Sequence, residues 1–151
     1  MKKNEAKEYL MMLSKQETAV KTAERDIQDL KELMMSIGGM NSGERVQKTR
    51  DNDRFGTIYA KIDEKERILE TETLNLVELR FKVSEEIQML KNARYVELLH
   101  RHYVKGETFL QIADKMGYSY RYVTKMHGKA LEEFGAVIQR EGVQGKGAER
   151  G

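Results

Sequence analysis

The residues of this chain whose types and spacing could do chemistry lie in one short stretch, residues 115–131. The stretch has no Asp or Glu, and its basic residues are Lys115, Arg121, Lys125 and Lys129. Basic side chains without neighbouring carboxylates attract anions, and Arg and Lys hydrogen-bond both phosphates and base edges. The chemistry expected here is therefore binding, with nucleic acid as the leading candidate and a solvated, merely basic helix as the alternative.

Charge is distributed unevenly along the chain. Residues 92–131 include seven basic and three acidic residues, a net charge of +4. Residues 1–91 and residues 132–151 each have a net charge of −1, so the whole chain has only +2. The positive field is thus local, and the overall charge says little about it.

Residues that could support catalysis or hold a metal ion are scarce. The chain has no Cys, which excludes a thiolate nucleophile and fits a reducing compartment. His100 and His102 are two residues apart, about 200° around a helix, so they cannot bind one metal ion. His127 is distant in sequence, and all three histidines are expected on helix surfaces or partly packed. We expect no enzymatic activity, no catalytic or metal-binding residue and no cofactor, because no nucleophile triad or phosphate-binding glycine loop is present.

The elements that must position the basic stretch are three short helices. They are expected at about 93–104, 108–116 and 120–139. Ser119 is a favourable N-cap for the third, and Gly117 lies where the turn before it needs a positive backbone dihedral. The small, glycine and apolar positions have the spacing of a helix-turn-helix, at Ala113, Gly117, Val123 and Met126.

The third helix then has two faces. Val123, Met126, Ala130 and Leu131 are expected to face inward, and Tyr120, Arg121, Thr124, Lys125 and Gly128 to face outward. The second helix of such a pair enters the DNA major groove through its N-terminal residues. The candidate DNA-binding residues are therefore Ser119, Tyr120, Arg121, Tyr122, Thr124, Lys125 and Lys129.

The stretch "LLHRHYVKGETFLQIADKMGYSYRYVTKMHGKALEEF" resembles the helix-turn-helix of region four of bacterial sigma factors. The resemblance covers about 40 residues and rests on the hydrophobic spacing, on "GETFLQIA" before "MGYS", and on "AL" in the third helix. The whole chain resembles small sigma-like regulators encoded by phages and prophages of low-GC Gram-positive bacteria. The resemblance implies transcriptional regulation of phage genes, double-stranded DNA and host RNA polymerase as partners, and a place at the nucleoid in the bacterial cytoplasm.

The N-terminal part has the heptad pattern of a long helix with a helical partner. Apolar residues recur every seven positions, at Ala6, Leu13, Val20, Ile27 and Met34. A second column follows three residues later, at Tyr9, Gln16, Ala23, Leu30 and Ile37. Such a seam favours coiled-coil packing, and Gly38 and Gly39 are expected to end the helix.

A second long helix is expected at about 57–90. Its heptad column is Ile62, Leu69, Leu76, Val83 and Leu90. Two helices of similar length can form an antiparallel hairpin within one chain, which we favour. A coiled coil between chains, giving a homodimer, is the alternative.

The sequence therefore predicts an all-α protein: a helical hairpin or coiled coil over 1–91, a helix-turn-helix domain over 92–141, and a flexible tail over 142–151. The Gly-rich loop 38–56 is expected to be a solvated connector, or alternatively a basic arm that touches phosphate.

No apolar run approaches the roughly 20 residues of a membrane span, and no membrane partner is expected. Competing functions are DNA packaging or recombination in a phage, and a polymerase-docking module that does not bind DNA.

Overall fold

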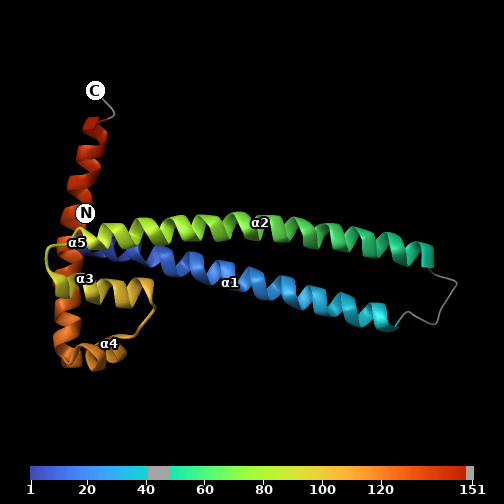
Figure 1. The fold of residues 1–151 in the computed structure, drawn as a ribbon, viewed down its shortest axis with the longest axis horizontal. Helices are drawn as coiled ribbons and strands as arrows, with labels where there is room; N and C mark the ends of the chain where they lie inside the picture. Colours follow the sequence, from blue (N-terminus) through green and yellow to red (C-terminus); the bar gives the residue numbers. More distant parts are fainter. Residues whose placement is uncertain (41–47, 149–151) are drawn as a thin grey trace. The chain divides into compact units, whose positions relative to one another are not determined.

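Every regular secondary-structure element in the described part of the computed structural model is a helix, which confirms the expected all-α class (Figure 1). The structure describes the backbone of residues 1–40 and 48–148, and the side chains of residues 1–37 and 52–142. The elements are α1 (Lys3–Met40), α2 (Lys48–Gln88), α3 (Ala93–Leu99), a π-helical turn η1 (His100–Val104), α4 (Phe109–Met116) and α5 (Tyr120–Ala148). Many good helix formers and the absence of Pro permit helices of this length.

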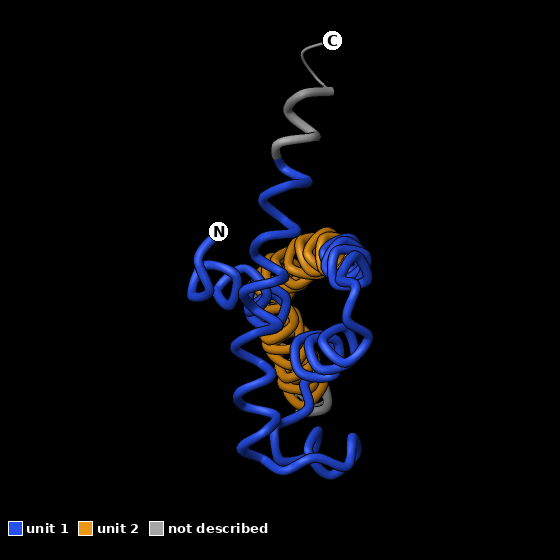
Figure 2. The backbone as a smooth tube through the Cα atoms, turned by 90° about the vertical axis from the view of Figure 1, so that its left-hand side faces the viewer, with its two compact units in different colours: residues 1–16, 77–151 blue, residues 17–76 orange. Residues whose placement is uncertain are grey.

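The chain divides into two compact units, and α1 and α2 each contribute to both (Figure 2). Unit 1 contains residues 1–16 and 77–151, and unit 2 contains residues 17–76. This grouping does not follow the expected division between residues 91 and 92, because the first turns of α1 pack with later parts of the chain. In unit 1 the ring centroids of Tyr9 and Phe134 are 6.1 Å apart, and the Tyr9 hydroxyl donates a hydrogen bond of 2.6 Å to Glu86 Oε1.

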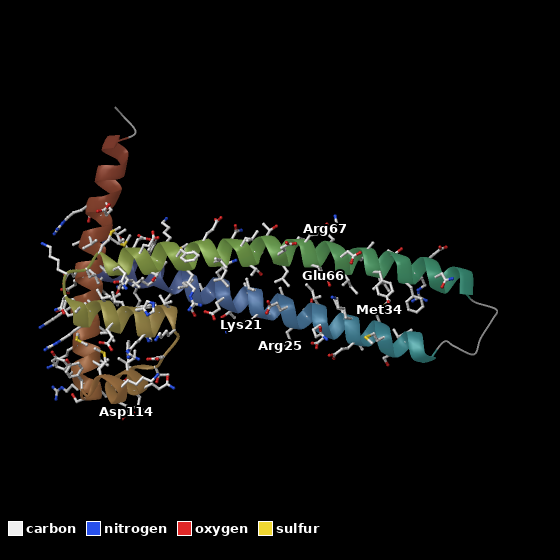
Figure 3. All side chains as sticks on the ribbon, in the orientation of Figure 1. Lys21, Arg25, Met34, Glu66, Arg67 and Asp114 are labelled. Atoms are coloured by element: carbon white, nitrogen blue, oxygen red, sulfur yellow. The ribbon has the colours of Figure 1, made fainter. Side chains whose placement is uncertain are left out.

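Unit 2 is an antiparallel helical hairpin closed within the chain, as we favoured from the heptads. Ile27 and Met34 of α1 and Ile62 of α2 form its buried cluster, and Figure 3 shows Met34 and Glu66 between the two helices. Lys31 forms an ion pair with Glu66, and a second pair joins Lys65 Nζ to Asp26 Oδ2 at 3.7 Å. The apolar seam supplies the stability, since exposed ion pairs add little.

The first heptad column of each long helix corresponds closely to burial, whereas the second column of α1 is half-buried and Ile37 in it is exposed. All five residues of the first column are buried: Ala6, Leu13, Val20, Ile27 and Met34. In the second heptad series, Ile62 and Val83 of α2 are buried, as is Leu90, two residues beyond the end of α2, whereas Leu69 and Leu76 are half-buried. The seven-residue pattern therefore identified the packed face of both long helices.

Several expected boundaries were wrong. Helix α1 continues through Gly38 and Gly39 to Met40, and α2 begins at Lys48 instead of near residue 57. Phe55 packs against the hairpin cluster, which extends α2 toward its start despite Gly56. The expected loop is thus helical at both ends; residues 41–47 lie outside the described residues, as do the basic side chains at positions 45, 48 and 50. Residues 142–148 of the expected tail belong to α5, because glycines weaken a helix without blocking its hydrogen bonds.

Unit 1 has its own core beneath the basic stretch. Its buried cluster is Leu98, Ile112, Ala113, Val123 and Met126. Partly buried side chains surround this cluster, namely Tyr95, Phe109, Met116 and Tyr118. Helices α3, α4 and α5 thus share one core, which fixes the start of α5.

Candidate nucleic-acid interface

Helix α4 has well-defined ends. Thr108 and Gln111 form a reciprocal capping box: Thr108 Oγ1 accepts from the Gln111 backbone N–H at 3.2 Å, and Gln111 Oε1 accepts from the Thr108 backbone N–H at 2.9 Å. The helix ends at Gly117, whose φ of 73° lies in the left-handed region, as expected from the sequence. The Tyr118 backbone N–H then bonds to Ala113 O at 2.9 Å, which reverses the chain toward α5.

Helix α5 begins where the sequence indicated. Ser119 Oγ accepts a hydrogen bond of 3.1 Å from the Tyr122 backbone N–H, so the predicted N-cap is confirmed. Ile112 and Ala113 of α4 meet Val123 and Met126 of α5 in the buried cluster. The apolar spacing therefore produces the expected pair of crossing helices joined by a glycine turn.

Six of the seven candidate residues, all except Thr124, are exposed along α5 and its cap. They are Ser119, Tyr120, Arg121, Tyr122, Lys125 and Lys129. Thr124 is half-buried, and its hydroxyl donates to Arg121 O at 2.8 Å. Among the described residues no ion pair involves Arg121, Lys125 or Lys129. Their charges are therefore available to an external anion.

Two features of the basic stretch differ from expectation. Lys115, one of its four cations, is paired: Lys115 Nζ lies 2.7 Å from Glu107 Oε1, and Arg101 reaches the other carboxylate oxygen at 3.4 Å. The Lys115 hydrogen bond is the main reason that the pKa of Glu107 is lowered. Gly128 was expected to face outward, but it is buried against the side chain of Lys3. A Cβ built at position 128 would lie only 2.7 Å from Lys3 Nζ. The first turn of α1 thus covers this point of α5.

A hollow of about 510 Å³ lies beside the start of α5. It is lined by Leu110, Gln111, Ala113, Asp114, Tyr118 and Tyr120. Leu110 is one of the more exposed large apolar side chains of the chain. The hollow therefore offers apolar and aromatic contact next to the exposed cations of α5.

His127 is a titratable residue whose burial was not predicted from the sequence. It is only 9% exposed, and its Nε2 lies 2.7 Å from the Tyr103 hydroxyl oxygen. Burial, followed by the charges of His102, Lys7 and Lys3, lowers the pKa of His127 to about 4, while burial raises that of Tyr103 to about 12. The spacing from Val123 to Ala130 could have revealed this position, because residue 127 lies on the same helical face.

The described residues contain no group of three or more His, Cys, Asp or Glu side chains that could hold a metal ion. His102 instead stacks on Phe109 with ring centroids 4.3 Å apart. Nor does any helix in the described part of the chain have the length and apolar character needed to cross a membrane. Comparison of this chain with protein-family models, with curated proteins and with solved structures found no match.

Proposed function

We propose that this chain is a sequence-specific DNA-binding protein that regulates transcription, with α5 as its recognition helix. The observation that carries the proposal is the exposed set Arg121, Lys125 and Lys129 on the helix that follows the Gly117 turn, none of which forms an ion pair with another described residue. A phosphate backbone attracts such a face, and the first turns of the second helix in this motif lie in the major groove. The resemblance to sigma region four supports the same function.

Arg121 and Lys125 have different proposed roles. Arg121 lies in the first turn of α5, where its planar guanidinium can pair with a guanine edge. Lys125 is one turn later and is assigned to a phosphate, which positions the protein without reading sequence. Ser119, Tyr120, Tyr122, Thr124 and Lys129 complete the proposed interface.

The roles can be separated by binding measurements on the full chain. A site is first selected from random duplex DNA, and affinity is then measured by fluorescence anisotropy at several salt concentrations. Arg121→Ala is expected to cost about 1–3 kcal/mol on the selected site and little on random DNA. Lys125→Ala is expected to weaken both and to lower the salt slope by about one.

Arg140→Ala supplies a matched control. Arg140 is exposed on the same helix, 19 residues beyond Arg121, or about 30 Å along the axis. The Arg140→Ala variant should bind both the selected and the random DNA as the unmodified chain does. If Arg121→Ala and Lys125→Ala also leave affinity unchanged in low salt, α5 is not a recognition helix.

The resemblance extends the proposal to control of phage or prophage genes at the bacterial nucleoid, with host RNA polymerase as a second partner. Sedimentation of the chain with and without purified polymerase tests that contact and, in the same experiment, a homodimer. A chain that binds polymerase but no DNA would instead be a docking module.

A further inference from the structure

Arg94 is a basic residue of α3, outside the helix-turn-helix pair α4 and α5, and its side chain lies against the turn that joins them. It is the second residue of α3, and its backbone N–H bonds to Asn92 Oδ1 at 3.0 Å, which fixes the first turn of that helix. Its guanidinium carbon is 5.8 Å from the centroid of the Tyr118 ring, within cation–π range. Arg94 is exposed, and no ion pair within the described residues involves it.

Tyr118 is a well-supported platform for this cation. Its ring packs against the buried cluster of unit 1, and its backbone N–H is bonded to Ala113 O. The ring centroid of Tyr122, on the first turn of α5, is 4.9 Å away. We call the three side chains in contact, Arg94, Tyr118 and Tyr122, the Arg94 array. Its last member, Tyr122, directly follows Arg121 in the sequence.

The chemistry of the Arg94 array suits an anion. A guanidinium stacked on an aromatic face keeps its N–H edge free, and that edge matches two oxygens of a phosphate. Stacking also limits the orientations of a long side chain, so less conformational entropy is lost on binding. A carboxylate partner in the chain would have used this edge, and the described residues supply none.

We propose that Arg94, oriented by Tyr118, contacts a phosphate of the same DNA duplex that α5 reads. The inference rests on the proposed function and adds a second element, α3, to the interface. Because Arg94 is not on α5, its contact is assigned to the backbone, where it positions the protein and discriminates no base. The competing possibility is that the stacking only holds α3 to the turn before α5.

Salt titration distinguishes these two possibilities. Arg94→Gln removes the charge but keeps much of the stem over the ring. We expect it to weaken binding to selected and random DNA by a similar factor, about 3- to 10-fold at 0.1 M salt, and to lower the salt slope by about one. Arg94→Lys should retain the slope because it retains the charge. Melting temperatures should be unchanged in both variants.

Variants at Tyr118 test the positioning. Tyr118→Phe keeps the ring and should bind DNA as the unmodified chain does. Tyr118→Leu removes the ring and should weaken binding, and adding Arg94→Gln to it should cause less than the additive loss. Additive losses, or a Tyr118→Leu chain that binds normally, would show that the ring does not orient Arg94.

The outcomes also separate this inference from the proposed function. An unmodified chain that binds no duplex DNA overturns both. A chain that binds DNA and is sensitive to Arg121→Ala, yet has the same salt slope with Arg94→Gln as without it, overturns the contact at Arg94 alone. A lower melting temperature with unchanged DNA binding would assign Arg94 a purely structural role.

Discussion

The buried His127 should make unit 1 sensitive to mild acid. Above pH 6.5 its imidazole is neutral in both the folded and unfolded chains. As pH falls, the unfolded chain takes up a proton near pH 6.5, whereas the folded chain does so only near pH 4, the lowered pKa of His127. Stability is therefore complete above about pH 6.5 and is lost progressively down to about pH 4. At about 1.4 kcal/mol per pH unit, the total loss is about 3 kcal/mol.

Urea unfolding measured by tyrosine fluorescence is a suitable assay, because every tyrosine except Tyr59 belongs to unit 1. Between pH 7.5 and pH 5.5, His127 alone should remove about 1.4 kcal/mol of unfolding free energy. Burial also lowers the pKa of His100, which adds a loss of the same sign. Glu107, whose pKa is lowered mainly by the Lys115 hydrogen bond, loses its contribution only in more acidic solution.

The variant His127→Gln isolates the effect. It cannot be protonated, so its unfolding free energy should fall less than that of the unmodified chain between pH 7.5 and pH 5.5, by the share assigned to His127. The comparison concerns this pH dependence and not absolute stability, so a weaker hydrogen bond between residue 127 and Tyr103 does not disturb it. If both chains lose the same free energy over this range, His127 is not held neutral by burial.

Two further predictions concern the packed helices. Ile27→Asp places a carboxylate in the hairpin seam, where Ile27 is 6% exposed, and should cost more than about 3 kcal/mol; an unchanged melting curve by circular dichroism would refute the seam. Gly135→Ala should lower the melting temperature, because its Cβ would lie 2.7 Å from the Met1 carbonyl oxygen. Gly142→Ala is its control and should raise stability by about 0.5–1 kcal/mol, since nothing lies within 4 Å of that position. Equal rises in both glycine variants would contradict the packing of α1 on α5.

Local spacing predicted much of this structure. The heptads identified the buried column of α1, and the positions of Gly117 and Ser119 identified the turn and the cap of α5. These features depend on residues close in sequence, where backbone preference and helical period act directly. The helical period also predicted that Arg121 and Lys125 are exposed on α5.

Features that depend on distant contacts were missed. Gly128 lies on the outward face by period alone, and only Lys3, 125 residues away, explains its burial. Tyr9 contacts Phe134 and Glu86, and these contacts join residues 1–16 to the rest of unit 1. No pattern in the sequence near any of the three residues predicts them. Helix ends were also missed at Met40 and Lys48, since a glycine that keeps helical backbone angles weakens a helix without ending it.

The division of unit 1 into residues 1–16 and 77–151 has a consequence for synthesis on the ribosome. Leu10 and Leu13 are synthesised long before Phe134, whose ring contacts that of Tyr9 in the same N-terminal segment. The hairpin of unit 2 has short-range contacts and can form while the chain is still being extended. Unit 1 cannot close until α5 has emerged, so a nascent chain stopped before α5 would hold an apolar N-terminal surface open to chaperones and proteases. Closure of unit 1 and formation of the proposed DNA-reading surface on α5 therefore depend on the same helix.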